Sequence, residues 1–134
     1  DSMMDTLYGG DRLILCPALS SPDRGDIVVI NRYTDEPLVK RVIGVAGDTL
    51  EIDEEQHKVR LNGELLDEPY VQYPTPAYDM TGEVAVPEGY VFVMGDHRND
   101  SHDSRAADIG LVPVDDIVGW AAFRIWPPQR IGIL

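Results

Sequence analysis

Short runs of Val, Ile, Leu and aromatic residues recur along the chain between clusters of Gly, Pro, Asp and Asn, and helical periodicity is weak. Such runs at this spacing, with no convincing long helix, are typical of an antiparallel β-domain of folded-over sheets. The 134 residues fit one domain, spanning positions 1–134. The predicted strands are Arg12–Cys16, Asp26–Arg32, Leu38–Val45, Thr49–Ile52, Lys58–Leu61, Tyr90–Met94 and Ile117–Ile125.

Three connecting segments stand out. Asn62-Gly63 predicts a two-residue hairpin between Lys58–Leu61 and Glu64–Leu66. Glu68 to Glu83 carries three prolines and three tyrosines, and we expect a solvated loop there, within a surface excursion at about residues 66–86. Gly95–Arg105 gathers acidic, basic and hydroxyl side chains directly after an apolar strand, where functional groups often lie.

The charge balance limits the partners of the chain. Eleven Lys plus Arg against 24 Asp plus Glu give a formal net charge of −13, which excludes nucleic acid as a default partner. The same charge opposes docking on anionic lipid, so any approach to a membrane should rely on exposed apolar side chains. Cys16 is the single cysteine, so an internal disulfide and a four-cysteine zinc site are both excluded.

Lys40 has an unusual setting for a lysine. It is one of only two lysines and lies in an apolar strand, where alternation places its side chain on one face with Leu38 and Val42. Burial disfavours the ammonium form, and a neutral amine can serve as a general base near neutral pH. The alternative is that Lys40 snorkels to solvent or lies on an edge strand. Lys58 lies in a polar, turn-flanked strand, and we expect it to be ordinary.

Ser2 is the second candidate, because its hydroxyl precedes an apolar segment and the Gly9-Gly10 turn. Taken by itself, Ser2 is equally well explained as a frayed terminal residue or a helix cap.

Four motifs occur in a fixed order and together resemble the boxes of bacterial type I signal peptidases, the membrane-anchored serine peptidases that remove signal peptides from exported proteins. The resemblance extends from residue 2 to residue 105. The motifs are Ser2-Met3-Met4-x-Thr6-Leu7, Gly25-Asp26-Ile27-Val28-Val29, Lys40-Arg41-Val42-Ile43-Gly44-Val45-x-Gly47-Asp48 and Gly95-Asp96-x-Arg98-x-x-Ser101-x-Asp103-Ser104-Arg105.

The resemblance implies a signal-peptidase-like β-domain with a Ser–Lys dyad, in which Ser2 is the nucleophile and Lys40 the neutral general base. Ser101 matches the residue whose hydroxyl orients the lysine amine. The other supporting roles implied are a partner for Arg41, a pair that braces the loop and a structural arginine: Asp96, Asp103 with Arg105, and Arg98. Such a dyad requires neither a metal nor a cofactor, and we expect none.

The resemblance also implies a substrate and a location. Signal peptides of secretory preproteins would bind extended beside the lysine-bearing strand. Small side chains one and three positions before the cut would enter shallow apolar pockets. The enzyme would act at the extracytoplasmic face of the plasma membrane, held by an N-terminal anchor that this chain lacks. The residues expected to line the pockets are Met3, Leu7, Leu13, Leu38 and Val39.

Three positions depart from the family pattern. Asp5 and Ala46 stand where the family usually has Pro, and His97 stands where it usually has Asn. His97 and His102 raise the possibility of a Ser–His–Asp triad, but in relatives with that triad the His replaces the Lys, which is retained here.

Other functions fit parts of the sequence. A self-cleaving Ser–Lys peptidase related to the repressors of the DNA-damage response would need an upstream cleavage segment. An EF-hand loop begun at Asp96 would need Gly at its sixth position and Glu at its twelfth, where Ser101 and Ala107 stand. Zinc bound through His97 and His102 lacks a third ligand of obvious spacing. A non-catalytic β-domain would tolerate loss of Lys40.

Overall fold

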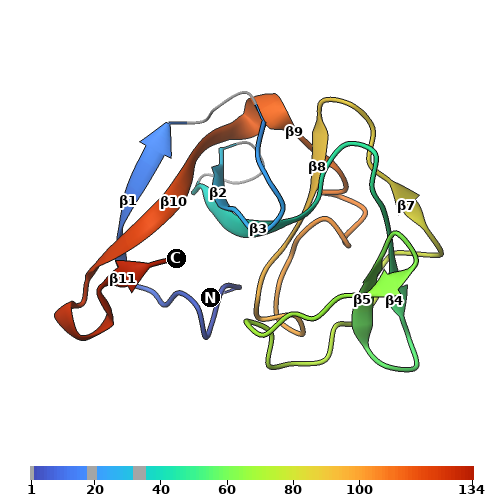
Figure 1. Cartoon of the computed structure of the whole chain (residues 1–134), viewed down its shortest axis with the longest axis horizontal. Coiled ribbons are helices and arrows are strands. Elements are labelled where there is room, and N and C mark those ends of the chain that lie inside the picture. The colour runs from blue at the N-terminus through green and yellow to red at the C-terminus, as the bar shows by residue number, and fades with distance from the viewer. Residues whose placement is uncertain (1, 18–20, 32–35) are drawn as a thin grey trace.

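The computed structural model describes residues 2–17, 21–31 and 36–134, which form β-strands joined by turns and two short 3-10 helices (Figure 1). The prediction of a mainly antiparallel β fold is confirmed. Each predicted strand is present with bounds within two residues of those expected, although Arg32, the end of one of them, lies outside the described residues. In chain order the elements are β1 (Arg12–Pro17), β2 (Ile27–Ile30), β3 (Leu38–Gly44), β4 (Thr49–Asp53), β5 (Lys58–Leu61), β6 (Glu64–Leu65), β7 (Val84–Ala85), β8 (Tyr90–Met94), β9 (Val112–Pro113), η1 (Val114–Asp116), β10 (Ile117–Trp126), η2 (Pro128–Arg130) and β11 (Gly132–Ile133).

The larger sheet positions the lysine-bearing strand. In the part of the chain that the structure describes, its order is β1-β10-β2-β3-β8-β9, with β11 paired to β10. β10 is ten residues long: Ile117–Trp120 pairs with β2 and Gly119–Trp126 pairs with β1, and β10 extends beside β1 on the left side of Figure 1. β3 therefore lies inside the sheet, between β2 and β8.

The smaller sheet has the order β6-β5-β4-β7 among the described residues. The predicted hairpin joins β5 to β6, with Leu61 opposite Glu64. Asn62 and Gly63 adopt positive φ of 51° and 88°, the left-handed conformation that this tight turn requires and that Asn and Gly tolerate best. The Asn62 side chain also accepts a hydrogen bond from the Thr49 N–H at 2.8 Å, which ties the turn to β4.

Apolar side chains on the two sheets form three clusters. One cluster lies on one face of β2, β3 and β8 and includes Val28, Val42 and Val93. A second joins the two sheets through Ile43 and Leu50. The third packs the N-terminal segment against the large sheet and is made of Met3, Leu7, Ile27 and Ala121, with Leu13, Val39 and Leu134 beside it.

Three strands were absent from the sequence-based prediction: β7, β9 and β11. Each has only two residues, too few for an alternating pattern to appear. They are strands because β4, β8 and β10 offer them unpaired backbone groups. Their partners lie far away in the sequence or across a turn, so only the assembled sheets define them.

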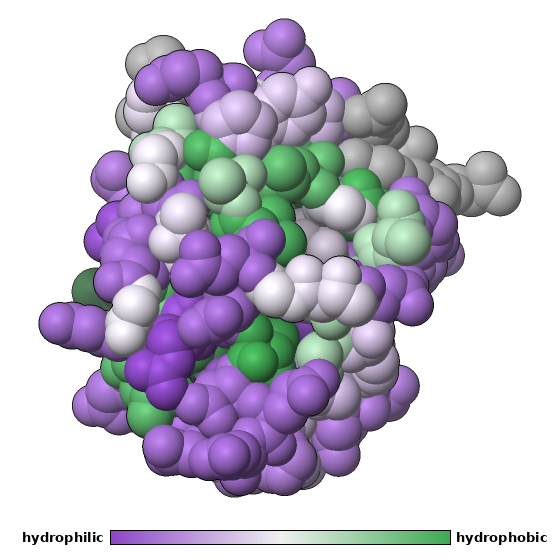
Figure 2. All heavy atoms as spheres, turned by 90° about the vertical axis from the view of Figure 1, so that its right-hand side faces the viewer, coloured by the Kyte–Doolittle hydropathy of each residue, from purple (hydrophilic) through white to green (hydrophobic). Residues whose placement is uncertain are grey.

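The face shown in Figure 2 is mainly hydrophilic, with smaller hydrophobic areas between the polar residues. This view looks onto the side of the smaller sheet, and its polarity agrees with the strongly acidic composition. Within the described ranges, no helix has the length and apolar character needed to cross a bilayer.

Candidate active site

The structure brings Ser2, Lys40 and Ser101 together from three distant parts of the chain. The Nζ atom of Lys40 lies 2.7 Å from Ser2 Oγ and 3.2 Å from Ser101 Oγ. Both are hydrogen-bond distances, and a neutral amine can accept the hydroxyl proton of Ser2 at the shorter one. The two serines flank the amine, which leaves it little freedom to point elsewhere.

Lys40 is buried, with only 3% of its surface exposed. Its place in the middle of β3 puts it among apolar neighbours, as the alternation predicted, since Val42 on the same face is also fully buried. Burial lowers the pKa of Lys40 to about 8, while the Asp103 carboxylate raises it and the Arg105 guanidinium lowers it. A substantial fraction of the amine is therefore neutral in mildly alkaline solution. Lys58 is exposed on β5.

Gly95 allows the loop after β8 to approach the nucleophile. A Cβ atom on this residue would overlap the Ser101 hydroxyl and the Ser2 carbonyl oxygen, which are backbone and side-chain groups of the site itself. The Gly95 N–H donates to Ser101 Oγ at 3.2 Å and to Asp103 Oδ2 at 3.0 Å. The N–H of His97, two residues after Gly95, donates to the Ser2 carbonyl at 2.8 Å, which ties the nucleophile segment directly to this loop.

Asp103 and Arg105 form a buried ion pair behind Ser101. The Arg105 guanidinium donates to both oxygens of the carboxylate, at 2.9 and 2.8 Å. Burial alone would raise the pKa of the Asp103 carboxyl, but Arg105, the Gly95 N–H and the Ser101 hydroxyl together hold it below its usual value. Because Ser101 donates to Asp103 at 2.8 Å, its lone pairs are directed toward Lys40.

Arg41 and Asp96 form the second ion pair expected beside the dyad. Arg41 donates from Nε to Asp96 Oδ1 at 2.9 Å and from Nη2 to Oδ2 at 2.7 Å, and its third nitrogen bonds the Gly25 carbonyl. Thr6 donates its hydroxyl proton to Asp96 at 2.5 Å. Asp96 therefore joins the strand that carries Lys40 to the segment that carries Ser2.

The loop at residues 68–78 contacts the arginines that support the site, and the sequence analysis did not predict these contacts. Glu68 accepts two hydrogen bonds from the buried Arg98, and the Tyr70 ring lies 3.9 Å from the guanidinium carbon of Arg41. Tyr78 covers Arg105 in the same way at 4.5 Å. The loop is thus not uniformly solvated: the Glu68 side chain is buried, whereas Tyr78 remains 48% exposed. The available signal in the sequence was a polar loop with three closely spaced tyrosines in a domain with structural arginines, because aromatic faces attract guanidinium groups.

Four of the five predicted pocket residues lie together. Met3 and Leu7 are buried in the cluster of the N-terminal segment, and Leu13 and Val39 pack against it. Leu38 is the exception, since it packs against the cluster formed by Val28 and Val42. Leu38 and Val39 are neighbours on β3 and pack against different clusters, because successive side chains of a strand point to opposite faces.

Two of the three departures from the family pattern lie near each other. The Asp5 carboxylate accepts a hydrogen bond from Tyr8 at 2.8 Å, and this bond is the main reason that the pKa of Asp5 is lowered, with a smaller contribution from the charge of His97. The His97 ring lies 4.4 Å from the ring of Tyr73. His102 is remote from this contact, bonded to the exposed Asp108 at 2.7 Å.

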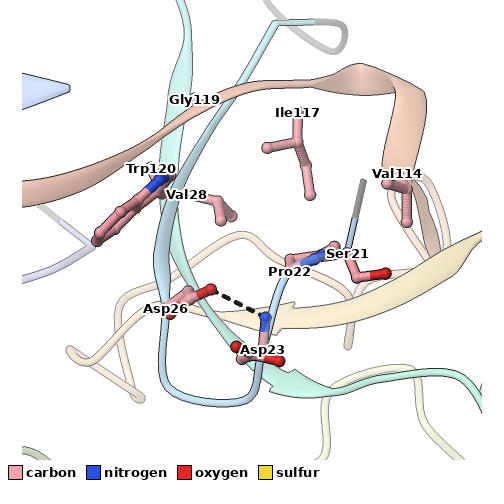
Figure 3. Close-up of a pocket in the computed structure, with 9 residues that line it drawn as sticks. All are labelled: Ser21, Pro22, Asp23, Asp26, Val28, Val114, Ile117, Gly119 and Trp120. Atoms are coloured by element: carbon pink, nitrogen blue, oxygen red, sulfur yellow. Dashed lines mark hydrogen bonds between the residues drawn. The ribbon is translucent and has the colours of Figure 1, made fainter. Parts of the chain in front are cut away.

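A separate apolar pocket of about 160 Å³ lies between β2, β10 and the segment before β2 (Figure 3). Val28, Ile117 and Trp120 form its apolar wall, and the Asp23 N–H bonds the Asp26 carboxylate at its edge. Ser2, Lys40 and Ser101 do not line it, so this pocket is distinct from the candidate site. Among the described residues, no group of three His, Cys, Asp or Glu side chains is arranged to hold a metal ion.

Comparisons with known proteins identify the family of this chain. Residues 1–126 match the family model described as signal peptidase, peptidase S26. The chain is 41% identical to the probable signal peptidase I-2 of Synechocystis sp., covering 99% of this chain and 63% of that protein. It is 38% identical to the signal peptidase I of Bacillus caldolyticus, covering 94% of this chain and 75% of that protein.

The fold is also shared with a solved structure. A crystal structure of a signal peptidase I from Enterococcus faecalis V583 superposes with a TM-score of 0.59 at 28% identity, covering 76% of this chain and 97% of the other. With the family model matching nearly the whole chain, this chain belongs to the signal peptidase family, peptidase S26.

Proposed function

We propose that this chain is a serine endopeptidase that cleaves N-terminal signal peptides from exported proteins, with Ser2 as the nucleophile and Lys40 as the general base. The contact that carries the proposal is the 2.7 Å distance between Lys40 Nζ and Ser2 Oγ inside a buried site. The family match favours this function over a self-cleaving repressor or a non-catalytic β-domain.

The reaction would begin with transfer of the Ser2 hydroxyl proton to neutral Lys40. Ser2 Oγ then attacks the carbonyl carbon of the scissile peptide, and we expect the Ser2 backbone N–H to donate to the developing oxyanion. The Lys40 ammonium returns its proton to the leaving amine as the C–N bond breaks. Lys40 next removes a proton from water, which attacks the carbonyl carbon of the Ser2 ester. As the ester C–O bond breaks, Lys40 returns this proton to Ser2 Oγ and the signal peptide leaves with a new carboxyl group.

The substrate has a strand edge available beside Lys40. Within the described residues, β8 pairs with β3 at Arg41, Val42 and Gly44, and this pairing does not extend to Leu38–Lys40. An extended peptide can hydrogen-bond to that part of β3 as an added strand. Met3, Leu7 and Val39 would then supply the apolar surface for the small side chains before the cut.

The proposed location is the extracytoplasmic face of the plasma membrane. Apolar side chains are exposed along β1, β10 and β11, although the net charge of −13 opposes attraction to anionic lipid. Membrane contact through these side chains would be hydrophobic rather than electrostatic. The exposed residues include Ile14, Leu15, Phe123, Ile125, Trp126 and Ile133.

Cleavage of a preprotein in detergent by the wild-type chain and three variants tests the function. Ser2→Ala and Lys40→Ala should each abolish cleavage, whereas Lys58→Ala should cleave at the wild-type rate because Lys58 is exposed on β5. Equal activity of Ser2→Ala and wild type would refute the proposal.

A further inference from the structure

Two arginines near the end of the chain bind the backbone of the nucleophile segment. Arg124, on β10, donates from Nη1 to the Thr6 carbonyl oxygen at 2.6 Å. Arg130, in η2, donates from Nη2 to the same oxygen at 3.1 Å. One carbonyl four residues after Ser2 thus accepts hydrogen bonds from two guanidinium groups more than 110 positions away in the sequence.

Asp11 holds the two arginines in place. Its carboxylate lies 3.4 Å from Arg124 Nη1 and 3.2 Å from Arg130 Nη1, and it also accepts the Tyr8 N–H at 3.0 Å. Arg124 Nε donates to the Arg130 carbonyl at 2.6 Å, which fixes η2 against β10. Arg130 additionally covers the Tyr8 ring at 4.5 Å. The single carboxylate compensates two cations that would otherwise repel each other.

The bound carbonyl is rigidly connected to Ser2. The N–H groups of Thr6 and Leu7 both donate to the Met3 carbonyl, at 2.8 and 2.7 Å, so residues 3–7 form a closed turn. The Thr6 hydroxyl is held by Asp96 on the other side. Before β1 begins at Arg12, the described residues of this segment belong to no strand, so its position depends on contacts such as these.

We propose that Arg124 and Arg130 are positioning residues that hold the Thr6 carbonyl and thereby keep Ser2 Oγ at attacking distance from Lys40 and the substrate. These two arginines are called the clamp below. The inference rests on the proposed function of Ser2 and Lys40 and adds residues that it did not include. Arg130 lies beyond residue 126, where the match to the family model ends.

The position of the clamp predicts a selective kinetic effect. The printed contacts of the arginines do not include Lys40, so their loss should leave the titration of Lys40 unchanged. A misplaced nucleophile instead slows the chemical step, and a displacement of about 1 Å can cost about a hundredfold in rate. Loss of either arginine should therefore lower kcat while the pH profile is retained.

The test compares Arg130→Met with Arg60→Met. The two arginines have equally exposed side chains, 29% in each case, and both bind an Asp, but Arg60 lies in the smaller sheet, paired with Asp53. Arg130→Met should lower kcat at least about tenfold, with an unchanged acidic limb of the pH profile. Arg60→Met should leave kcat unchanged, and Arg130→Lys should recover part of the loss, since an ammonium group can still donate one hydrogen bond.

Thermal unfolding of each variant, measured beside the kinetics, separates positioning from folding. A kcat for Arg130→Met equal to that of wild type would overturn the clamp, and so would an equal fall in kcat for Arg60→Met. Ser2→Ala is assayed in parallel. If Ser2→Ala retains full activity, the proposed function fails and the clamp with it; if Ser2→Ala is inactive and Arg130→Met unimpaired, the clamp alone fails.

Discussion

The backbone of Gly95 passes so close to Ser101 that no side chain fits between them. The same position faces the Ser2 carbonyl oxygen, so one glycine sets the approach of the nucleophile segment and of the serine that orients Lys40. A methyl group here would have to displace backbone as well as side chain, which the closely packed interior resists.

Gly95→Ala should therefore lower kcat about a hundredfold or more by separating Ser2 and Ser101 from Lys40. Gly132→Ala is the matched control, since an added Cβ there meets nothing within 4 Å. Both variants are compared by preprotein cleavage and thermal unfolding. Wild-type cleavage by Gly95→Ala would show that the close approach is not required.

Ser101→Ala should reduce kcat/KM about tenfold to a hundredfold, because Lys40 loses the hydrogen bond that aims its amine. Ser104→Ala is its control: Ser104 is also buried and accepts the Val93 N–H at 2.9 Å, but the structure gives it no bond to Lys40. That variant should lose about 1 kcal/mol of stability with little change in kcat/KM. Equal kcat/KM values for Ser101→Ala and Ser104→Ala would contradict the orienting role of Ser101.

The pH dependence of kcat/KM should show an acidic limb near pH 8. The lowered pKa of Lys40 leaves the amine protonated and inactive below that value, and activity rises as the proton is lost. Initial rates at low substrate concentration between pH 6 and about pH 10 measure this limb. A limb near the ordinary lysine value of 10.5 would contradict the burial of Lys40.

The same lowered pKa should make stability depend on pH. Below pH 8 the ammonium group is charged in both the folded and the unfolded chain, and its burial destabilises the fold. Between pH 8 and 10.5 the unfolded chain binds more protons at this site, so the stability contribution rises with pH. Since each pKa unit corresponds to about 1.4 kcal/mol, the total change is about 3 kcal/mol.

Denaturant unfolding of wild type and Lys40→Met across this pH range isolates the lysine. The free energy of unfolding of wild type should rise by about 3 kcal/mol relative to Lys40→Met. Parallel curves for the two proteins would mean that Lys40 is not desolvated.

The buried ion pair of Arg105 should contribute more to stability than a pair of similar geometry whose arginine is half exposed. Arg105 and Arg24 each donate twice to one carboxylate, but the Arg105 side chain is fully buried, whereas that of Arg24 is 50% exposed. Arg105→Met should lower the free energy of unfolding by about 3–5 kcal/mol, because Asp103 is left buried and unpaired. Arg24→Met should cost less, about 1–2 kcal/mol, because water can take the place of the half-exposed guanidinium beside the buried Asp48. Equal losses in urea unfolding would contradict this difference.

The sequence by itself determined the features that depend on short stretches of chain. Alternation of apolar residues defined the long strands and the apolar neighbours of Lys40, and Asn62-Gly63 defined a hairpin through their tolerance of positive φ. The ordered motifs also indicated Ser2, Lys40 and Ser101 as one group. These features follow from local backbone preferences and from recognisable residue patterns, which need no knowledge of the folded shape.

Only the tertiary structure decided which distant groups support the dyad. Tyr70 covers Arg41, Leu38 packs away from Met3, and Arg124 and Arg130 meet at the Thr6 carbonyl. Such contacts depend on strand register and on how a loop returns over a sheet, and a shift of one residue would reverse the face of each side chain. The chain carries the side chains for these contacts, but the packing of two sheets and their loops determines where each one lies.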